Sequence, residues 1–173
     1  MAQGKRGKFL ESKIEQTNNM YKAKGWALVD KVPTPWNVSY NRRTGKVFQA
    51  FPEEKGTVDF VGISQGNSIA FDAKSTDNKT SFPLKNIKHH QVKYLEIHQE
   101  QGGISFMIVD FDKLRKVFLL TYDQLKMWWV DSFREGRKSI PYSFFNNECK
   151  QIASSRGVAI DYLEELEWLT NWT

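Results

Sequence analysis

Apolar residues follow two different periods along this chain, one typical of helices and one of strands. A helix over about residues 8–24 is predicted by apolar residues at helical spacing, namely Phe9, Leu10, Ile14 and Tyr21. Gly25 stands where a glycine would end that helix. The stretch "WALVDKV" then predicts a strand, and two prolines interrupt the pattern after it.

The middle of the chain predicts two hairpins. Two alternating runs in "WNVSYNRRTGKVFQAF", about residues 36–50, surround a turn that contains Arg42, Arg43 and Gly45. We expect this hairpin to have an exposed basic tip. The runs "TVDFVGI" and "NSIAFDAK" form a second hairpin around Gln65, Gly66 and Asn67.

Helices and strands alternate in the remainder. A helix over about residues 84–99 is followed by "ISFMIVDF", a nearly continuous apolar run that indicates a strand covered on both faces. The run "KVFLLT" predicts another strand, and the last third, from residue 122, is expected to be mainly helical, with "DYLEELEWL" on its last helix. The order predicts an α/β fold, a mixed β-sheet flanked by helices, in one domain over residues 1–173.

Composition and charge narrow the class of protein. Of 173 residues, 40% are apolar and the formal charge is +5, which indicates a globular protein and favours an anionic partner such as nucleic acid. A single cysteine, Cys149, excludes an internal disulfide and a multi-cysteine zinc site. The first 16 residues carry charges throughout and lack the apolar region of a secretory signal, so we do not expect them to act as one, and no apolar run approaches the ~20 residues of a membrane span. We therefore expect a cytoplasmic protein with no membrane partner.

Three charged residues stand in the second hairpin, where packing residues are expected. Side chains alternate across a strand, so Asp72 and Lys74 share one face of "SIAFDAK" while the other face is apolar. A tight hairpin brings Asp59, at the start of the first strand, alongside Asp72. Two such carboxylates can share a Mg²⁺ ion that activates water and polarises a phosphate, which the lysine helps to stabilise. A surface ion pair between Asp72 and Lys74 is the structural alternative.

Two further polar residues lie on helix faces that are otherwise apolar. Glu11 is in line with Ile14 on the first helix, so it borders the buried face. Gln91 is in line with Leu95 on the later helix, so it faces inward. The structural alternative for Glu11 is a carboxylate that lies at the edge of the buried face without a functional role. The structural alternative for Gln91 is a buried amide that is hydrogen-bonded to the backbone.

The order of these residues, a helical Glu, then Asp, then D-x-K on the next strand, then a helical Gln, resembles the restriction-endonuclease-like nucleases with the PD-(D/E)xK core. More narrowly, the chain resembles the RecU family of Holliday junction resolvases. The matching stretches run through nearly the whole chain: "GKFLESKIEQTNNMY", "VPTPWNV", "TVDFVGI", "FDAKSTDNKTSFPLKNIKHHQ", "QGGISFMI", "GRKSI" and "IDYL". The stretch "DAKSTDNKTSFPL" followed by "HQ" is far more specific than D-x-K alone.

The resemblance implies a Mg²⁺-dependent endonuclease, with Mn²⁺ able to substitute, that acts as a homodimer. Its substrates would be four-way junctions and branched DNA, and paired nicks would leave 5′-phosphate ends. Host recombination and branch-migration proteins would be further partners. Carried over by position, Asp59 and Asp72 are metal ligands and Lys74 is the catalytic lysine. Glu11 would bind the metal or orient a metal-bound water, and Gln91 would support the metal shell.

The basic hairpin stands where that family has a protruding stalk that enters the junction centre. The residues that we expect to contact DNA are basic: Arg6, Arg42, Arg43, Lys46, Lys79, Lys85 and Lys88. The chain departs from the family pattern at Asp72, where Glu is more frequent, and in the segment before Asp59, which lacks the Pro of the general motif. Two other functions are compatible with the sequence: a sequence-specific duplex DNA endonuclease of the same fold, and a non-catalytic junction-binding recombination module.

Overall fold

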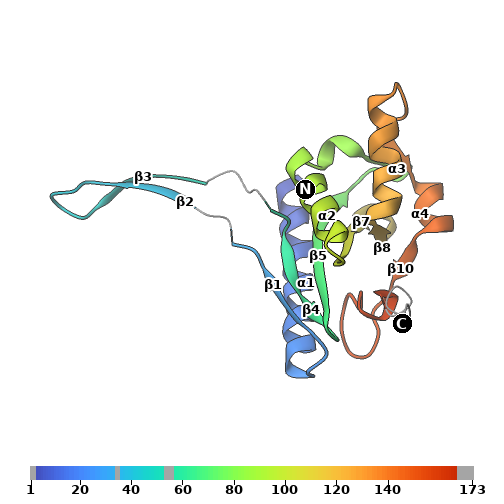
Figure 1. The fold of residues 1–173 in the computed structure, drawn as a ribbon, viewed down its shortest axis with the longest axis horizontal. Helices are drawn as coiled ribbons and strands as arrows, with labels where there is room; N and C mark the ends of the chain where they lie inside the picture. Colours follow the sequence, from blue (N-terminus) through green and yellow to red (C-terminus); the bar gives the residue numbers. More distant parts are fainter. Residues whose placement is uncertain (1–2, 34–35, 53–56, 167–173) are drawn as a thin grey trace.

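A six-stranded mixed sheet forms the centre of the protein, with helices on both of its faces (Figure 1). The computed structural model describes residues 3–33, 36–52 and 57–166. The strand order is β1-β4-β5-β7-β8-β10, and only β5 and β7 run parallel. The strands are β1 Leu28–Lys31, β4 Phe60–Ser64, β5 Asn67–Thr76, β7 Ile104–Phe111, β8 Lys116–Thr121 and β10 Lys150–Ile152. This arrangement confirms the predicted α/β class and fits the restriction-endonuclease-like fold.

Helices alternate with these strands along the chain. Because a parallel pair needs a crossover, the chain between β5 and β7 passes through a short 3₁₀ helix and α2. The helices are α1 Gln3–Ala23, η1 Leu84–Asn86, α2 His89–Glu100, η2 Asp112–Leu114, α3 Tyr122–Phe133, α4 Tyr142–Glu148 and η3 Glu164–Leu166. None of the helices in the described part of the chain is long and apolar enough to span a membrane.

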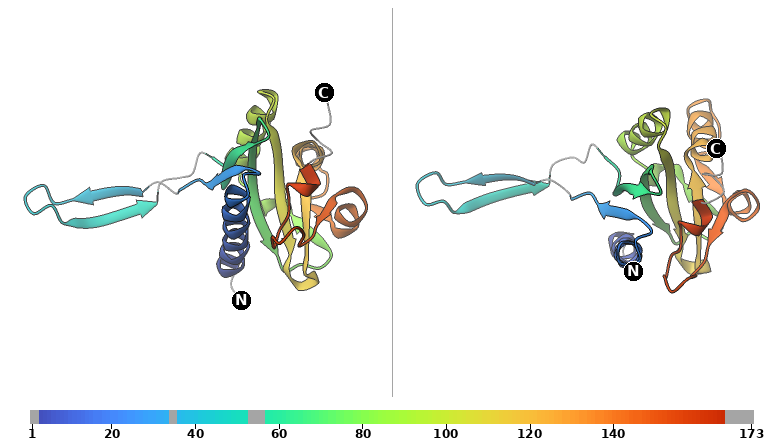
Figure 2. Two further views of the ribbon diagram at one scale, coloured as in Figure 1. Left: turned by 90° about the horizontal axis from the view of Figure 1, so that it is seen from below. Right: turned by 60° about the horizontal axis from the view of Figure 1, so that its bottom comes forward.

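One face of the sheet is covered by α1 and by residues 158–166, and the other by α2, α3 and α4 (Figure 2). On the α1 face, the rings of Phe60, Phe71 and Phe106 stack across three adjacent strands with centroids 4.9 and 4.7 Å apart. Leu10 and Ile14 of α1 are buried in the same cluster. As predicted, β7 is covered on both faces, since its residues alternate between the two cores.

The hairpin of β2 Trp36–Tyr40 and β3 Val47–Pro52 lies outside the main sheet. Figures 1 and 2 show it extending away from the body, and the side chains of residues 36–51 are all exposed. The side chain of Asn41 accepts hydrogen bonds from the backbone N–H groups of Arg43 and Thr44 at 2.9 and 3.2 Å, which fixes the turn. Its action as a DNA-binding stalk stays a prediction.

Two expectations about the second half of the chain were wrong. The helix expected over residues 84–99 is divided, because Ile87 and Lys88 have extended backbone between η1 and α2. The last third contains more than helices. A two-stranded sheet joins β6 Ser81–Pro83 to β9 Ser139–Pro141, and β10 completes the main sheet. Of "DYLEELEWL", the described residues form only η3, and residues 167–169 lie outside the described part of the chain.

Candidate active site

The β4–β5 hairpin brings two aspartates together. Phe60 pairs with Phe71, so one residue further along Asp59 stands opposite Asp72, as the hairpin register predicted. The Oδ2 atom of Asp59 accepts a hydrogen bond from the backbone N–H of Ala73 at 3.3 Å. The backbone of β5 therefore holds the Asp59 carboxylate beside that of Asp72.

Lys74 completes this cluster from the same face of β5. Its Nζ atom contacts Oδ2 of Asp72 and lies 3.8 Å from Oδ2 of Asp59. The Lys74 side chain is 20% exposed, whereas Asp72 is fully buried. Asp72 and Lys74 therefore do not form a surface ion pair, which was the alternative interpretation of the sequence. The carboxylate is inside the protein, and the lysine lies between it and solvent.

Gln91, on α2, fixes the orientation of the Asp72 side chain. Its Nε2 donates a hydrogen bond to Oδ1 of Asp72 at 2.8 Å, and its Oε1 accepts one from the backbone N–H of Lys88 at 3.0 Å. Gln91 is 6% exposed, which confirms that it faces inward. Because both ends of the amide are bonded, the start of α2 holds the Asp72 carboxylate in one orientation.

The buried position of Asp72 changes its acidity. Burial raises the pKa of Asp72 to about 8; Lys74 acts in the opposite direction, and the charge of Asp59 adds to the increase. Met107 of β7 stands beside Asp72 in the sheet and is fully buried, so this side of the carboxylate is apolar. Two neighbouring carboxylates and one ammonium give the site a net negative charge when all are ionised, which favours a cation.

Glu11 is not brought into this cluster. Its Oε2 atom lies 2.9 Å from Nζ of Lys31 on β1, and the same ammonium lies 2.7 Å from Oε1 of Glu15. The Glu11 side chain is 23% exposed. It borders the buried face of α1 as expected, but with Lys31 as its partner.

The donor atoms of the cluster fit a hard divalent cation with few protein ligands. Within residues 3–33, 36–52 and 57–166, no group of three or more His, Cys, Asp or Glu side chains is placed to hold a metal ion. Mg²⁺, however, is commonly bound through one or two carboxylates, with waters and phosphate oxygens completing its shell. Asp59 and Asp72 are such a pair, and a cation would offset the repulsion from Asp59, which adds to the effect of burial on the pKa of Asp72.

The basic residues expected to contact DNA lie in three places. Arg6, near the start of α1, forms an ion pair with Asp77 just after β5, at 3.1 Å. Three lysines that follow the cluster in sequence are exposed: Lys79, Lys85 and Lys88. Three basic residues are exposed at the tip of the β2–β3 hairpin: Arg42, Arg43 and Lys46. Of these three sets, only Lys79, Lys85 and Lys88 lie in the segment that directly precedes α2, whose first turn holds Gln91.

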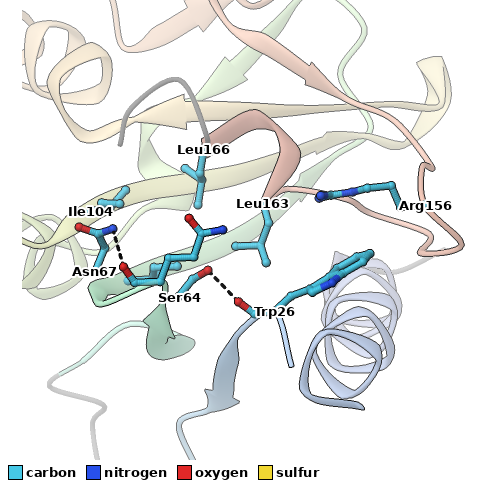
Figure 3. A pocket seen from close by; sticks show the side chains of 9 residues that line it. Trp26, Ser64, Asn67, Ile104, Arg156, Leu163 and Leu166 are labelled. Carbon is cyan, nitrogen blue, oxygen red and sulfur yellow. Dashed lines mark hydrogen bonds between the residues drawn. The ribbon is translucent and has the colours of Figure 1, made fainter. Parts of the chain in front are cut away.

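A separate cavity of about 150 Å³ lies at the other end of β5, beside the β4–β5 turn (Figure 3). Trp26, Arg156 and Leu163 line it together with residues of β4 and β5. Ser64 closes one side by donating a hydrogen bond to the carbonyl of Trp26 at 3.0 Å. None of the residues predicted for the active site lines this cavity.

Sequence reasoning missed two groups that shape the site. The backbone N–H of Ala73 donates a hydrogen bond to Asp59. Extending the register of the hairpin by one residue could have predicted this contact. Lys31 neutralises Glu11, and no local pattern indicates this, because it depends on how α1 packs beside β1.

The sheet, its helices and the carboxylate–lysine cluster place the chain in the restriction-endonuclease-like class. The family model for Recombination protein U (RecU) matches residues 5–168. A "Holliday junction resolvase RecU" of Pediococcus pentosaceus is 38% identical over 168 residues, which cover 95% of this chain and 84% of that relative. A protein of the same name from Geobacillus sp. is also 38% identical with the same coverage, and one from Levilactobacillus brevis is 35% identical over 170 residues, 96% of this chain and 85% of that relative. The chain belongs to the RecU family.

Proposed function

We propose that this chain is a divalent-metal-dependent endonuclease that resolves four-way (Holliday) DNA junctions by paired nicks during recombination and repair. The observation that carries the proposal is the cluster of Asp59, Asp72, Lys74 and Gln91 in a chain of the RecU family. The relatives named above carry the name Holliday junction resolvase. The products would have 5′-phosphate ends.

Asp59 and Asp72 would hold Mg²⁺ or Mn²⁺, since both are oxygen donors on one face of the β4–β5 hairpin. When bound, such a cation supplies an acidified water and stabilises charge on the phosphate. Glu11 is a proposed further contributor to this site. To reach it, Glu11 would have to exchange its ion pair with Lys31 for a contact on the metal side.

Lys74 and Gln91 would help the site to bind a phosphate group. The Lys74 ammonium is the most exposed member of the cluster, so a scissile phosphate would meet it first and be stabilised by its charge. Gln91 keeps Oδ1 of Asp72 engaged, which leaves Oδ2 as the oxygen that faces Lys74. The surrounding apolar residues strengthen these charge interactions by excluding water.

DNA would approach along exposed basic residues. Lys79, Lys85 and Lys88 precede α2, and Lys88 is the residue whose backbone N–H binds Gln91, so a phosphate contact there would lie close to the site. Arg42, Arg43 and Lys46 lie at the tip of a hairpin that extends from the body, a shape suited to a branch point (Figure 1). Arg6 would exchange its pair with Asp77 for a phosphate.

Paired nicks on a junction require two active sites. A four-way junction has approximate two-fold symmetry, and a homodimer would present two equivalent clusters to opposed strands. We therefore propose that the chain acts as a homodimer, together with host recombination and branch-migration proteins.

Cleavage of matched substrates tests this function against its rivals. A mobile four-way junction and a linear duplex of the same sequence are incubated with the protein, with Mg²⁺ or with EDTA. We expect rapid cleavage of the junction alone, only with Mg²⁺, and products with 5′-phosphate ends. Equal cleavage of the duplex would favour a sequence-specific duplex endonuclease, and tight junction binding without any cleavage would favour a non-catalytic module.

A further inference from the structure

Three aromatic side chains meet at the surface near the C-terminal end of α3. Phe133, the last residue of this helix, is 70% exposed, and no large apolar side chain in the described part of the chain is more exposed. Its ring lies edge-on to the ring of Trp129, one helical turn earlier, with centroids 5.6 Å apart. Trp129 is half-buried, and its ring centroid lies 6.4 Å from that of His89 on α2. Phe133, Trp129 and His89 thus form an aromatic platform.

The platform lies at the end of α2 that carries the proposed active site. His89 is the first residue of α2 and directly follows Lys88. The backbone N–H of Lys88 is bonded to the side chain of Gln91, which in turn is bonded to Asp72. A short chain of contacts therefore connects the ring of Trp129 to the buried carboxylate of the site.

Basic side chains surround the platform. The loop after α3 is held against η1, because the backbone N–H of Leu84 donates a hydrogen bond to the carbonyl of Lys138 at 3.0 Å and the Lys138 ammonium contacts the carbonyl of Ser132. Within residues 84–90 and 129–138 the exposed acids are Asp131 and Glu135. Five exposed cations outnumber them: Lys85, Lys88, Arg134, Arg137 and Lys138. This charge favours an anionic partner.

Exposed rings among cations fit an unpaired DNA base better than a duplex or a protein. Cations alone are sufficient to bind the phosphates of a duplex, whose bases present only their edges. An unpaired base presents its flat face, which stacks on an aromatic side chain whatever the base is, while cations bind the phosphates on either side. A protein partner could cover the rings but would not require the excess of positive charge.

We infer that the aromatic platform binds one unpaired base of the DNA substrate, stacked on Phe133, while Lys88 and Arg137 bind the neighbouring phosphates. This inference rests on the proposed function, because that function supplies DNA as the ligand. It adds a class of substrate to it: branched DNA that carries an unpaired nucleotide close to the scissile phosphate is bound more tightly than fully paired DNA.

Binding of four matched DNA molecules in Ca²⁺ tests the inference. A four-way junction and a linear duplex are each prepared with and without one unpaired 2-aminopurine nucleotide, placed at the branch point of the junction or at the centre of the duplex. The unaltered protein should bind each molecule that has the unpaired base about 5-fold more tightly, or more, than its fully paired counterpart. The fluorescence of 2-aminopurine should fall on binding, because it is quenched when the base stacks.

Phe133→Ala should abolish both the tighter binding and the loss of fluorescence, and Phe133→Trp should restore them. Because the Phe133 side chain is 70% exposed, its removal should leave the fold intact. The matched control is Met127→Ala, which removes a side chain that is 60% exposed on another face of α3 and should change neither effect. Arg137→Ala should weaken binding of all four molecules alike and reduce the salt slope by about one.

The same measurements separate this inference from the proposed function. If the junction is bound and cleaved preferentially but the unpaired base gives no tighter binding, or still gives it in Phe133→Ala, the inference is overturned and the proposed function stands. The rings would then serve a protein partner. If junction and duplex are bound and cleaved equally, but the effect of the unpaired base is present and is lost in Phe133→Ala, the proposed function fails and the inference stands. Absence of any DNA binding would overturn both.

Discussion

Gln91 and Asp72 are joined by a hydrogen bond of 2.8 Å, from Nε2 of the amide to Oδ1 of the carboxylate, between residues 19 positions apart. The carboxylate is fully buried, and the amide is itself held by the backbone N–H of Lys88. This relationship links the start of α2 to the middle of β5. It makes Gln91 a positioning residue for the proposed metal ligand Asp72, and its effect should be visible in metal dependence.

Gln91→Leu removes this hydrogen bond but keeps a side chain of similar volume. We expect junction cleavage at limiting Mg²⁺ to fall about 10- to 100-fold, because partners of metal ligands commonly contribute that much to metal affinity or activity. Cleavage should recover in part as Mg²⁺ is raised. The measurement is the cleavage rate over a Mg²⁺ titration.

The matched control is Gln101→Leu, an exposed glutamine just after the same helix. It should leave the Mg²⁺ titration unchanged. If Gln91→Leu lowered the rate equally at every Mg²⁺ concentration, the amide would not act through the metal site.

The tip of the β2–β3 hairpin should contribute more to the binding of four-way junctions than to the binding of duplex DNA. Arg42→Ala combined with Arg43→Ala is expected to weaken junction binding more than duplex binding, because only a branch point can receive a projecting loop. Loss of two phosphate contacts would also reduce the salt slope of junction binding by about two. Binding of both substrates in Ca²⁺ at several salt concentrations measures these effects.

Lys22→Ala combined with Lys113→Ala removes the same charge from two exposed positions on the body. This control should affect junction and duplex alike and only slightly. An equal loss for both substrates in the hairpin variant would make the tip a general phosphate contact.

Glu11 and Lys31 allow a structural role to be separated from a catalytic one. Glu11→Gln breaks the ion pair with Lys31, and Lys31→Met breaks both that pair and the pair with Glu15; each pair is worth less than about 1 kcal/mol at these partly exposed positions. If Glu11 contributes to the metal site, only Glu11→Gln should slow cleavage, and both variants should have similar stability. Cleavage rates that fall equally in the two variants would indicate that Glu11 acts only through Lys31.

Stability should depend on an ion pair far from the site. Burial alone would raise the pKa of Asp161, but hydrogen bonds from Arg156 and Tyr21 outweigh it and hold the pKa below its ordinary value. Arg156→Leu should lower the free energy of unfolding by roughly 2 to 3 kcal/mol. This is below the ~3–5 kcal/mol of a fully buried pair, because a third of the Arg156 side chain is exposed.

The pH dependence of this contribution has a definite sign. A carboxylate whose pKa is lower in the folded protein than its unfolded value of about 3.9 stabilises the fold above that pH, and the stabilisation is lost as the pH falls through the folded pKa. Urea unfolding at a series of pH values should therefore show the difference between Arg156→Leu and the unaltered protein shrinking below about pH 4. A difference that stayed constant down to pH 2 would contradict this assignment.

Local patterns were sufficient to predict the centre of the site. Strand alternation put Asp72 and Lys74 on one face, and a two-stranded hairpin with a tight turn fixed Asp59 opposite Asp72, because register follows from turn length. Helical spacing placed Gln91 inward. Asp59, Asp72 and Lys74 therefore come together through short-range geometry that the sequence contains.

Features that depend on packing between distant elements were not predictable in this way. The ion pair between Glu11 and Lys31 requires the placement of α1 beside β1. Strand β10 has only three residues, one of them buried. It forms because the edge of β8 is available for antiparallel pairing. The complete burial of Asp72 arises from α2 crossing that face of the sheet, which alternation in β5 alone does not show.

The most direct test of the account is cleavage of a mobile four-way junction in Mg²⁺ by the Asp72→Asn variant. Asn keeps the shape of the side chain but lacks the charge that would hold the cation. Asp110→Asn, on the neighbouring strand β7, is the matched control because Asp110 is half-buried and bonded to Ser75 but lies outside the cluster. The account predicts that Asp72→Asn loses cleavage while junction binding in Ca²⁺ persists and that Asp110→Asn still cleaves; normal cleavage by Asp72→Asn would contradict it.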